Sequence, residues 1–204
     1  PEEKYNGKKF TGAILFFVAV KSLGCYYSIG KKLIKCKKES VFFIKEGIMG
    51  KYFGTDGFRG EANKDLTVEH AFKIGRFLGW YYGKDKKARV VIGKDTRRSS
   101  YMLEYSIVAG LTASGADAYM LHVTTTPSVS YVTKQDEFDC GVMISASHNP
   151  YYDNGIKLVN RYGEKIDDAT ASLIEAYNDG DMARLGIDVK DLPLAKRERI
   201  GCIV

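Results

Sequence analysis

Apolar residues recur from residue 49 onward in two alternating patterns. Stretches with apolar positions every three to four residues predict helices, and short β-branched runs between them predict buried strands. Thr67 is a suitable N-cap for the first helix, and Gly83 ends its pattern. The predicted helices cover 68–82, 99–114, a short stretch after 127, and 167–178. The predicted strands cover 88–93, 118–123, 140–144 and 155–159.

Strands that alternate with helices of this length indicate crossover connections. The pattern therefore predicts an α/β fold, a three-layer α/β/α sandwich around a mostly parallel (mixed) sheet. In such sheets ligands bind beyond the carboxyl ends of the strands. The loops expected there are polar, and they cover 93–98, 124–127 and 145–150. We therefore expect the chemistry of the domain at one edge of the sheet.

Composition and charge narrow the class of protein. Hydrophobic residues make up 45% and charged residues 27%, as in ordinary globular proteins. The net charge is +6, but residues 1–48 hold ten lysines against four glutamates, and residues 49–204 hold 21 basic and 21 acidic residues. The part that carries the motifs is thus neutral, so no nucleic-acid partner is expected. Four cysteines without a CxxC pair favour a reducing, cytoplasmic setting.

Residues 1–48 differ from the rest of the chain. The apolar run Phe10–Val20 follows three lysines but is too short to span a bilayer, so no membrane partner is expected. A signal peptide is one interpretation. The favoured one is translated upstream sequence, because codons for residues 45–47 can spell a ribosome-binding site ahead of Met49. We therefore interpret residues 1–48 as a non-native or upstream-translated extension.

The third apolar strand leads directly into the sequence Ser-Ala-Ser-His-Asn-Pro. The neighbouring Ser147 and His148 suggest a hydrolase, but adjacent residues of an extended chain point to opposite sides. No G-x-S-x-G motif is present either. A plain polar turn remains an alternative, with Asn149-Pro150 and Asn154-Gly155 as turn dipeptides.

Three motifs carry a family resemblance. The segment 144–157, ISASHNPYYDNGIK, closely resembles the active-serine loop of the α-D-phosphohexomutase family. GTDGFRG at 54–60 and GKDTR at 93–97 resemble other signatures of that family's first domain. The resemblance covers residues 49–181, and 182–204 resembles the start of a linker toward a second domain. It implies one domain of a normally four-domain enzyme, whose domains II to IV belong to the same chain.

The resemblance implies a phosphoenzyme mechanism. Ser147 would carry a phosphoryl group, give it to one hydroxyl of a phosphosugar and recover another through a bisphosphorylated intermediate. Lys157 would pair with phosphate or take a proton from the attacking hydroxyl, and Arg59, flanked by Gly57 and Gly60, would reach the phosphoryl group. The motif wording is most similar to members that interconvert glucosamine 6-phosphate and glucosamine 1-phosphate. Mannose and glucose phosphates remain alternatives.

The same resemblance implies further groups at the site. His148 and Asn149 would orient the loop or touch substrate, and Arg97 and Arg98 would line the rim without a predicted direct contact. Mg²⁺ would bind through the phosphate of Ser147, and a sugar 1,6-bisphosphate would act as activator. The sequence lacks the family's D-G-D-x-D-R, G-E-x-S-G-H and R-x-S-G-T-E-P loops. We therefore expect the chain alone to be inactive, and a non-catalytic phosphosugar- or protein-binding domain stays open.

Overall fold

The computed structural model describes residues 17–18, 26–29, 32–35, 51–55, 57–188 and 190–204. The chain divides into two compact units, residues 1–48 and 49–204. In the first, β1 (Phe17–Val18), β2 (Tyr26–Ile29) and β3 (Lys32–Lys35) form an antiparallel sheet in the order β1-β2-β3. Most of the apolar run Phe10–Val20 lies outside the described residues, so its interpretation stays a prediction.

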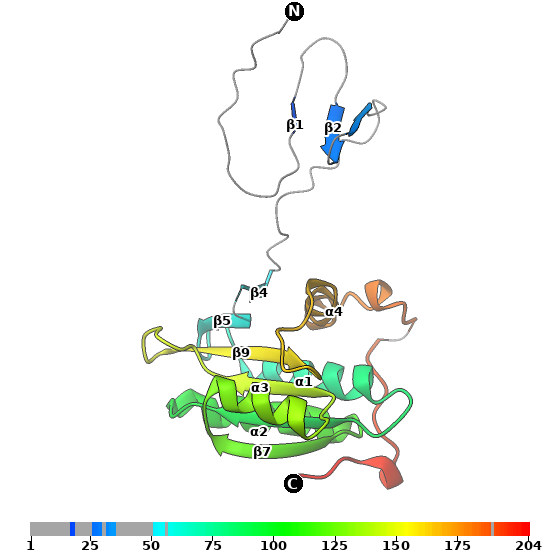
Figure 1. Ribbon diagram of the computed structural model, residues 1–204. Coiled ribbons are helices and arrows are strands. Elements are labelled where there is room, and N and C mark those ends of the chain that lie inside the picture. Colours follow the sequence, from blue (N-terminus) through cyan, green and yellow to red (C-terminus); the bar gives the residue numbers. More distant parts are fainter. Residues whose placement is uncertain (1–16, 19–25, 30–31, 36–50, 56, 189) are drawn as a thin grey trace, which may run out of the picture. The chain divides into compact units, whose positions relative to one another are not determined.

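The second unit contains a six-stranded sheet in the order β4-β5-β9-β8-β6-β7 (Figure 1). Its strands are β4 (Phe53–Gly54), β5 (Gly57–Glu61), β6 (Arg89–Lys94), β7 (Asp117–Val123), β8 (Cys140–Ile144) and β9 (Asp153–Asn160). Its α-helices are α1 (Val68–Tyr82), α2 (Arg98–Ala113), α3 (Thr126–Gln135) and α4 (Asp168–Asp179). Two 3-10 turns follow, Ala183–Leu185 and Arg197–Arg199.

Side chains that alternate along the strands build two separate cores. Val90 and Ile92 of β6 pack with the buried faces of α1, α2 and α4, whereas Val91 packs with Val129 of α3. The sheet is therefore covered on both faces, and the predicted three-layer α/β/α sandwich is confirmed. Within the described part of the chain, no helix has the length and apolar composition needed to cross a bilayer.

The parallel share of the sheet is smaller than its pattern predicts. β6 runs parallel to β7 and β8, but β8–β9, β5–β9 and β4–β5 are antiparallel. The reason is the connection between β8 and β9, which is only residues 145–152, whereas a parallel return needs a crossover of a dozen residues or more. The expected mixed sheet thus has three antiparallel and two parallel strand pairings. Asn154-Gly155, considered as a turn, lies inside β9.

The last residues of the chain pack along the domain. Cys202 and Val204 accept backbone hydrogen bonds from Ala118 and Met120 of β7, at 2.8 and 2.9 Å. Upstream, the buried Arg76 of α1 donates to the carbonyls of Leu192 and Pro193. The passage that follows α4 is therefore fixed to α1, α2 and β7.

Candidate active site

The loop between β8 and β9 carries Ser147 at the carboxyl end of β8. Ser147 is exposed and has a left-handed backbone, with φ +53°. Ser145 is buried, and its hydroxyl accepts a hydrogen bond from the Ser147 amide at 3.0 Å. A non-glycine residue in this conformation costs about 1 kcal/mol or more, so surrounding contacts must hold it. The exposed hydroxyl of the loop's two serines is therefore that of Ser147.

Lys157 on β9 donates a hydrogen bond from Nζ to the Ser147 Oγ at 2.7 Å. It stands opposite Met143 of β8, and this register places its side chain on the face that α3 covers. Lys157 also lines a hollow of about 260 Å³, together with Thr126 and Ser130 of α3. Lys157 thus both contacts the candidate nucleophile and contributes to the lining of a hollow.

Arg59 reaches the serine loop from β5. It stands opposite Gly155 of β9, so it projects from the same face as Lys157 two residues further on. A Cβ at Gly155 would meet Arg59 Cγ at 3.0 Å and the Ser145 carbonyl at 2.8 Å, so glycine is needed there. Arg59 Nη1 donates to Asn149 Oδ1 at 3.1 Å, and Asn149 Nδ2 donates to Asp153 Oδ2 at 3.0 Å.

His148 is exposed, and none of the hydrogen bonds among the described residues involves its ring. Asn149, by contrast, uses both ends of its amide to join Arg59 to Asp153. The structure therefore brings Ser147, Lys157, Arg59 and Asn149 into one connected group, with His148 beside them. Contact of His148 or Asn149 with substrate stays a prediction.

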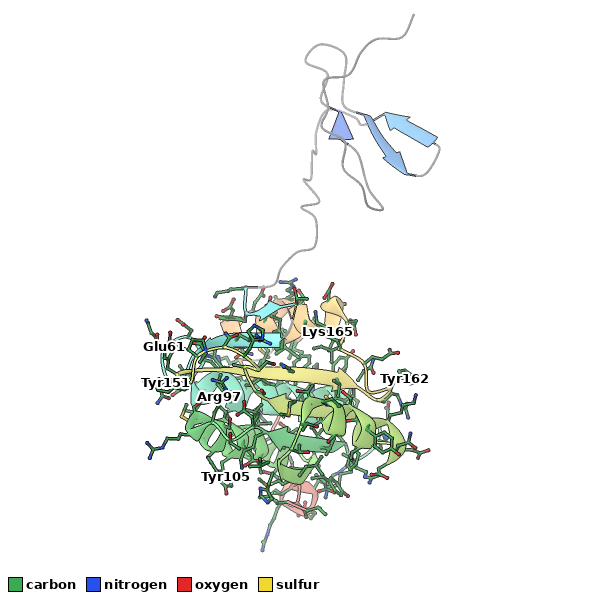
Figure 2. All side chains as sticks on the ribbon, turned by 60° about the vertical axis from the view of Figure 1, so that its left-hand side comes forward. Glu61, Arg97, Tyr105, Tyr151, Tyr162 and Lys165 are labelled. Carbon is green, nitrogen blue, oxygen red and sulfur yellow. The ribbon has the colours of Figure 1, made fainter. Side chains whose placement is uncertain are left out.

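Arg97 makes contacts that the sequence did not predict. From the loop after β6, its guanidinium donates to the carbonyls of Ser147 (3.0 Å), Asn149 (2.8 Å), Asp153 (3.0 Å) and Pro150. Figure 2 shows Arg97 at the same end of β9 as Tyr151. The GKDTR motif placed Arg97 on the rim, but main-chain acceptors leave no mark in a sequence. Arg98, its neighbour, is exposed.

Comparison with known proteins shows the family of the chain. A family model described as phosphoglucomutase/phosphomannomutase, alpha/beta/alpha domain I, matches residues 50–184. The chain belongs to the phosphoglucomutase/phosphomannomutase family. The predicted resemblance is thus confirmed, and the matched residues include all three motifs.

Curated relatives of this family are named phosphoglucosamine mutase. One from Lachnospira eligens is 69% identical over 159 residues, which are 76% of this chain and 34% of that protein. Another, from Bacillus cereus strain B4264, is 54% identical over 138 residues, 67% of this chain and 31% of that protein. The chain therefore spans about a third of the length of the curated relatives it matches.

Solved structures of the family share the fold. A phosphoglucomutase/phosphomannomutase family protein from Burkholderia thailandensis has a TM-score of 0.56 at 26% identity. The match covers 64% of this chain and 30% of that protein's chain. A putative phosphomannomutase from Thermus thermophilus has a TM-score of 0.56 at 28% identity, over 61% and 29% of the two chains.

A magnesium ion does not fit the surroundings of Ser147 by themselves. Mg²⁺ needs several oxygen ligands, and the side chains around Ser147 include the cations Lys157, Arg59 and Arg97. The nearby Asp153 accepts from Asn149. Among the residues that the structure describes, no three histidine, cysteine, aspartate or glutamate side chains gather as a metal site. The described residues around Ser147 therefore do not make the expected magnesium site by themselves.

Cys140 is not a competing nucleophile. It lies fully buried in β8, and burial raises the pKa of its thiol well above the ordinary value. A thiol that stays protonated is a poor nucleophile. Cys140 is therefore a buried free thiol.

Proposed function

We propose that residues 49–204 are the serine-bearing domain of a phosphosugar mutase that interconverts glucosamine 6-phosphate and glucosamine 1-phosphate. The observation that carries the proposal is the hydrogen bond of 2.7 Å between the Oγ of the exposed Ser147 and the Nζ of Lys157. The names of the relatives at 69% and 54% identity support glucosamine as the sugar.

The proposed reaction uses Ser147 in both directions. A sugar hydroxyl attacks the phosphorus of phosphoserine, the bond from phosphorus to Oγ breaks, and the hydroxyl proton is balanced by one gained at Oγ. Lys157 would donate that proton or stabilise the developing charge on Oγ, and its hydrogen bond to Ser147 Oγ supports this role. In the second half, Ser147 Oγ attacks the phosphorus of the other phosphate of the bisphosphorylated sugar, and the bond from that phosphorus to the sugar oxygen breaks. The proton lost from Ser147 is matched by one gained at the sugar oxygen, which leaves as a hydroxyl, and phosphoserine is regenerated.

Arg59 would neutralise phosphoryl charge during both transfers. Its guanidinium stands on the same sheet face as Lys157 and already donates to the serine loop through Asn149. Positioning and charge stabilisation supply most of the catalysis of phosphoryl transfer. We further propose Mg²⁺ and a sugar 1,6-bisphosphate as cofactor and activator of the complete enzyme, domains II to IV as its remaining parts, and a cytoplasmic location.

The experiment that tests this function is a hybrid enzyme. Residues 50–204 of this chain replace the matching third of the Lachnospira eligens relative, and conversion of glucosamine 6-phosphate is compared with conversion of mannose and glucose 6-phosphates. We expect turnover with a preference for glucosamine. A folded hybrid that turns over none of the three sugars contradicts a mutase role, and a preference for another sugar contradicts only the substrate.

A further inference from the structure

The guanidinium of Arg97 uses every hydrogen that it can donate. An arginine side chain has five N–H groups. In Arg97, Nε donates to Asp95 Oδ2 at 3.1 Å, and the two terminal nitrogens donate to the four carbonyls already described. Its side chain is only 13% exposed. No donor remains on Arg97 for a phosphate.

Three of the four carbonyls, those of Ser147, Asn149 and Pro150, belong to the loop between β8 and β9, and the fourth is that of Asp153, the first residue of β9. A backbone carbonyl removed from water needs a hydrogen-bond partner, and between β8 and β9 the sheet ladder is interrupted. Arg97 supplies those partners from outside the loop. Two of its acceptors, Ser147 and Asn149, lie on either side of His148, so the contact fixes the backbone on which Ser147 stands.

A buried polar network holds Arg97 in turn. Asp95 Oδ1 accepts from the Arg97 amide at 3.0 Å and from Ser100 Oγ at 2.8 Å. Asn154 Nδ2 donates to Ser100 Oγ at 3.0 Å, and both residues are fully buried. The Asp95 amide donates to the Ile144 carbonyl at the end of β8. The orientation of the guanidinium is therefore set by β6, α2, β8 and β9 before any substrate binds.

We propose that Arg97 is a positioning residue that holds the serine loop in the conformation in which Ser147 Oγ meets Lys157 Nζ. Asp95 orients Arg97 for this task. A lysine cannot replace it, because an ammonium group has three donors around one point and no planar fork. Without the fork, Ser147 leaves its left-handed backbone conformation, and a displacement of about 1 Å is enough to slow a positioned transfer about 100-fold. The catalytic consequence rests on the proposed function, whereas the loop geometry does not.

The first test measures amide hydrogen exchange by NMR in the 204-residue chain. The probes are the amides of Asn149 and Asp153, which donate to Ala146 and Pro150 within the loop. We expect Arg97→Lys and Arg97→Ala to speed their exchange about tenfold or more, while the amides of β8 keep their rates. Arg98→Ala, a change at the exposed neighbour, serves as the matched control.

Guanidinium chloride at a few tens of millimolar then tests the chemistry of the missing group. It is expected to restore part of the loop protection in Arg97→Ala and none in Arg97→Lys, with sodium chloride as control. Unchanged loop exchange in both variants overturns the proposal. Faster exchange throughout β8 as well also overturns it, because Arg97 would then stabilise the whole domain and not the loop.

The second test uses the hybrid enzyme. Because Arg97 has no donor left for substrate, Arg97→Lys should lower kcat about tenfold or more and leave KM within about twofold. A raised KM at unchanged kcat assigns Arg97 to substrate binding and overturns the proposal. A hybrid that is inactive with Arg97 intact counts against the proposed function alone, and the exchange measurement still decides the role of Arg97.

Discussion

Two arginines of this domain, Arg97 and Arg76, bind backbone carbonyls of segments outside the regular elements, and the two segments differ in what else holds them. Arg76 binds the passage at Leu192 and Pro193 and also donates to Ser114 Oγ at 2.7 Å. Leu192 itself is buried in the main core. That passage is therefore held by packing as well as by the arginine.

The serine loop has much less packing of this kind. Its residues 147, 148, 150, 151 and 152 are exposed, and Ala146 is the buried apolar residue at its start. The hydrogen bonds of Arg97 and Asn149 therefore carry most of its order. The comparison teaches that the same kind of contact occurs once in a packed passage and once in an exposed loop. An exposed loop leaves Ser147 accessible from solvent, which a packed loop would not.

The largest expected effect separates chemistry from folding within the serine loop. Ser147→Ala in the hybrid should lower mutase turnover at least about 10⁴-fold, because it removes the nucleophile. Its free energy of unfolding should change by less than about 0.5 kcal/mol, since the side chain is exposed. Turnover and urea unfolding are measured on the same preparation.

Ser145→Ala is the matched control for that change. It removes the acceptor of the Ser147 amide but leaves the Ser147 hydroxyl in place. It should therefore reduce turnover far less than Ser147→Ala and keep the phosphate on Ser147. Peptide mapping of the phosphorylated hybrid locates the label. Phosphate found on Ser145 contradicts the assignment of the nucleophile.

The next effect should appear in the packed passage. Arg76→Ala leaves the carbonyls of Leu192 and Pro193 and the hydroxyl of Ser114 without their donor, so we expect a loss of about 3 kcal/mol in the free energy of unfolding. The amides of Asn149 and Asp153 should not lose more protection from exchange than the domain as a whole loses. Arg161→Ala, at an exposed position, is the control and should cost less than about 0.5 kcal/mol.

The comparison would be contradicted if Arg76→Ala affected only local order and not the stability of the fold. If Arg76→Ala loosens only the C-terminal passage while the urea midpoint stays fixed, packing at Leu192 is not coupled to the fold. The contrast between a folding arginine and a positioning arginine would then disappear.

The elements were predictable where local signals agree. β8 was predicted to the residue, because a fully apolar run is bounded by Asp139 and Ser145, and α1 was bounded by Thr67 and Gly83. The direction of β9 was missed because apolar periodicity does not encode strand direction. The eight-residue length of the connection did carry that information, since it is too short for a crossover.

The site divides in the same way. Ser147, Lys157 and Arg59 could be selected as candidates from their motifs, because the residue type determines the chemistry of a side chain. The register of β5, β9 and β8 places Arg59 and Lys157 on the same face of the sheet. The roles of Arg97 and Arg76 could not be predicted, because their acceptors are main-chain carbonyls that any residue can offer.

The smallest expected effect sharpens the comparison with a change that should affect stability alone. Asp167 caps α4: its Oδ1 accepts from the Thr170 amide and its Oδ2 from the Thr170 hydroxyl, both at 2.8 Å. These hydrogen bonds lower the pKa of Asp167 below its ordinary value. The folded state therefore favours the charged carboxylate, so the stabilisation is present at neutral pH and is lost as the pH falls through and below the ordinary aspartate range, near about 4.

Asp167→Ala should cost about 1 kcal/mol at pH 7, and the difference from the parent chain should shrink as the pH approaches about 3. Asp167→Asn keeps a capping oxygen without the charge, so its smaller cost should vary less with pH. Urea unfolding across that pH range measures both.

Helix α4 also holds the start of the domain, because Glu175 accepts from the Tyr52 and Phe53 amides at 2.7 Å. A change in loop exchange at Asn149 in either variant would show that α4 and the serine loop are coupled, and that order in the loop does not depend on Arg97 alone.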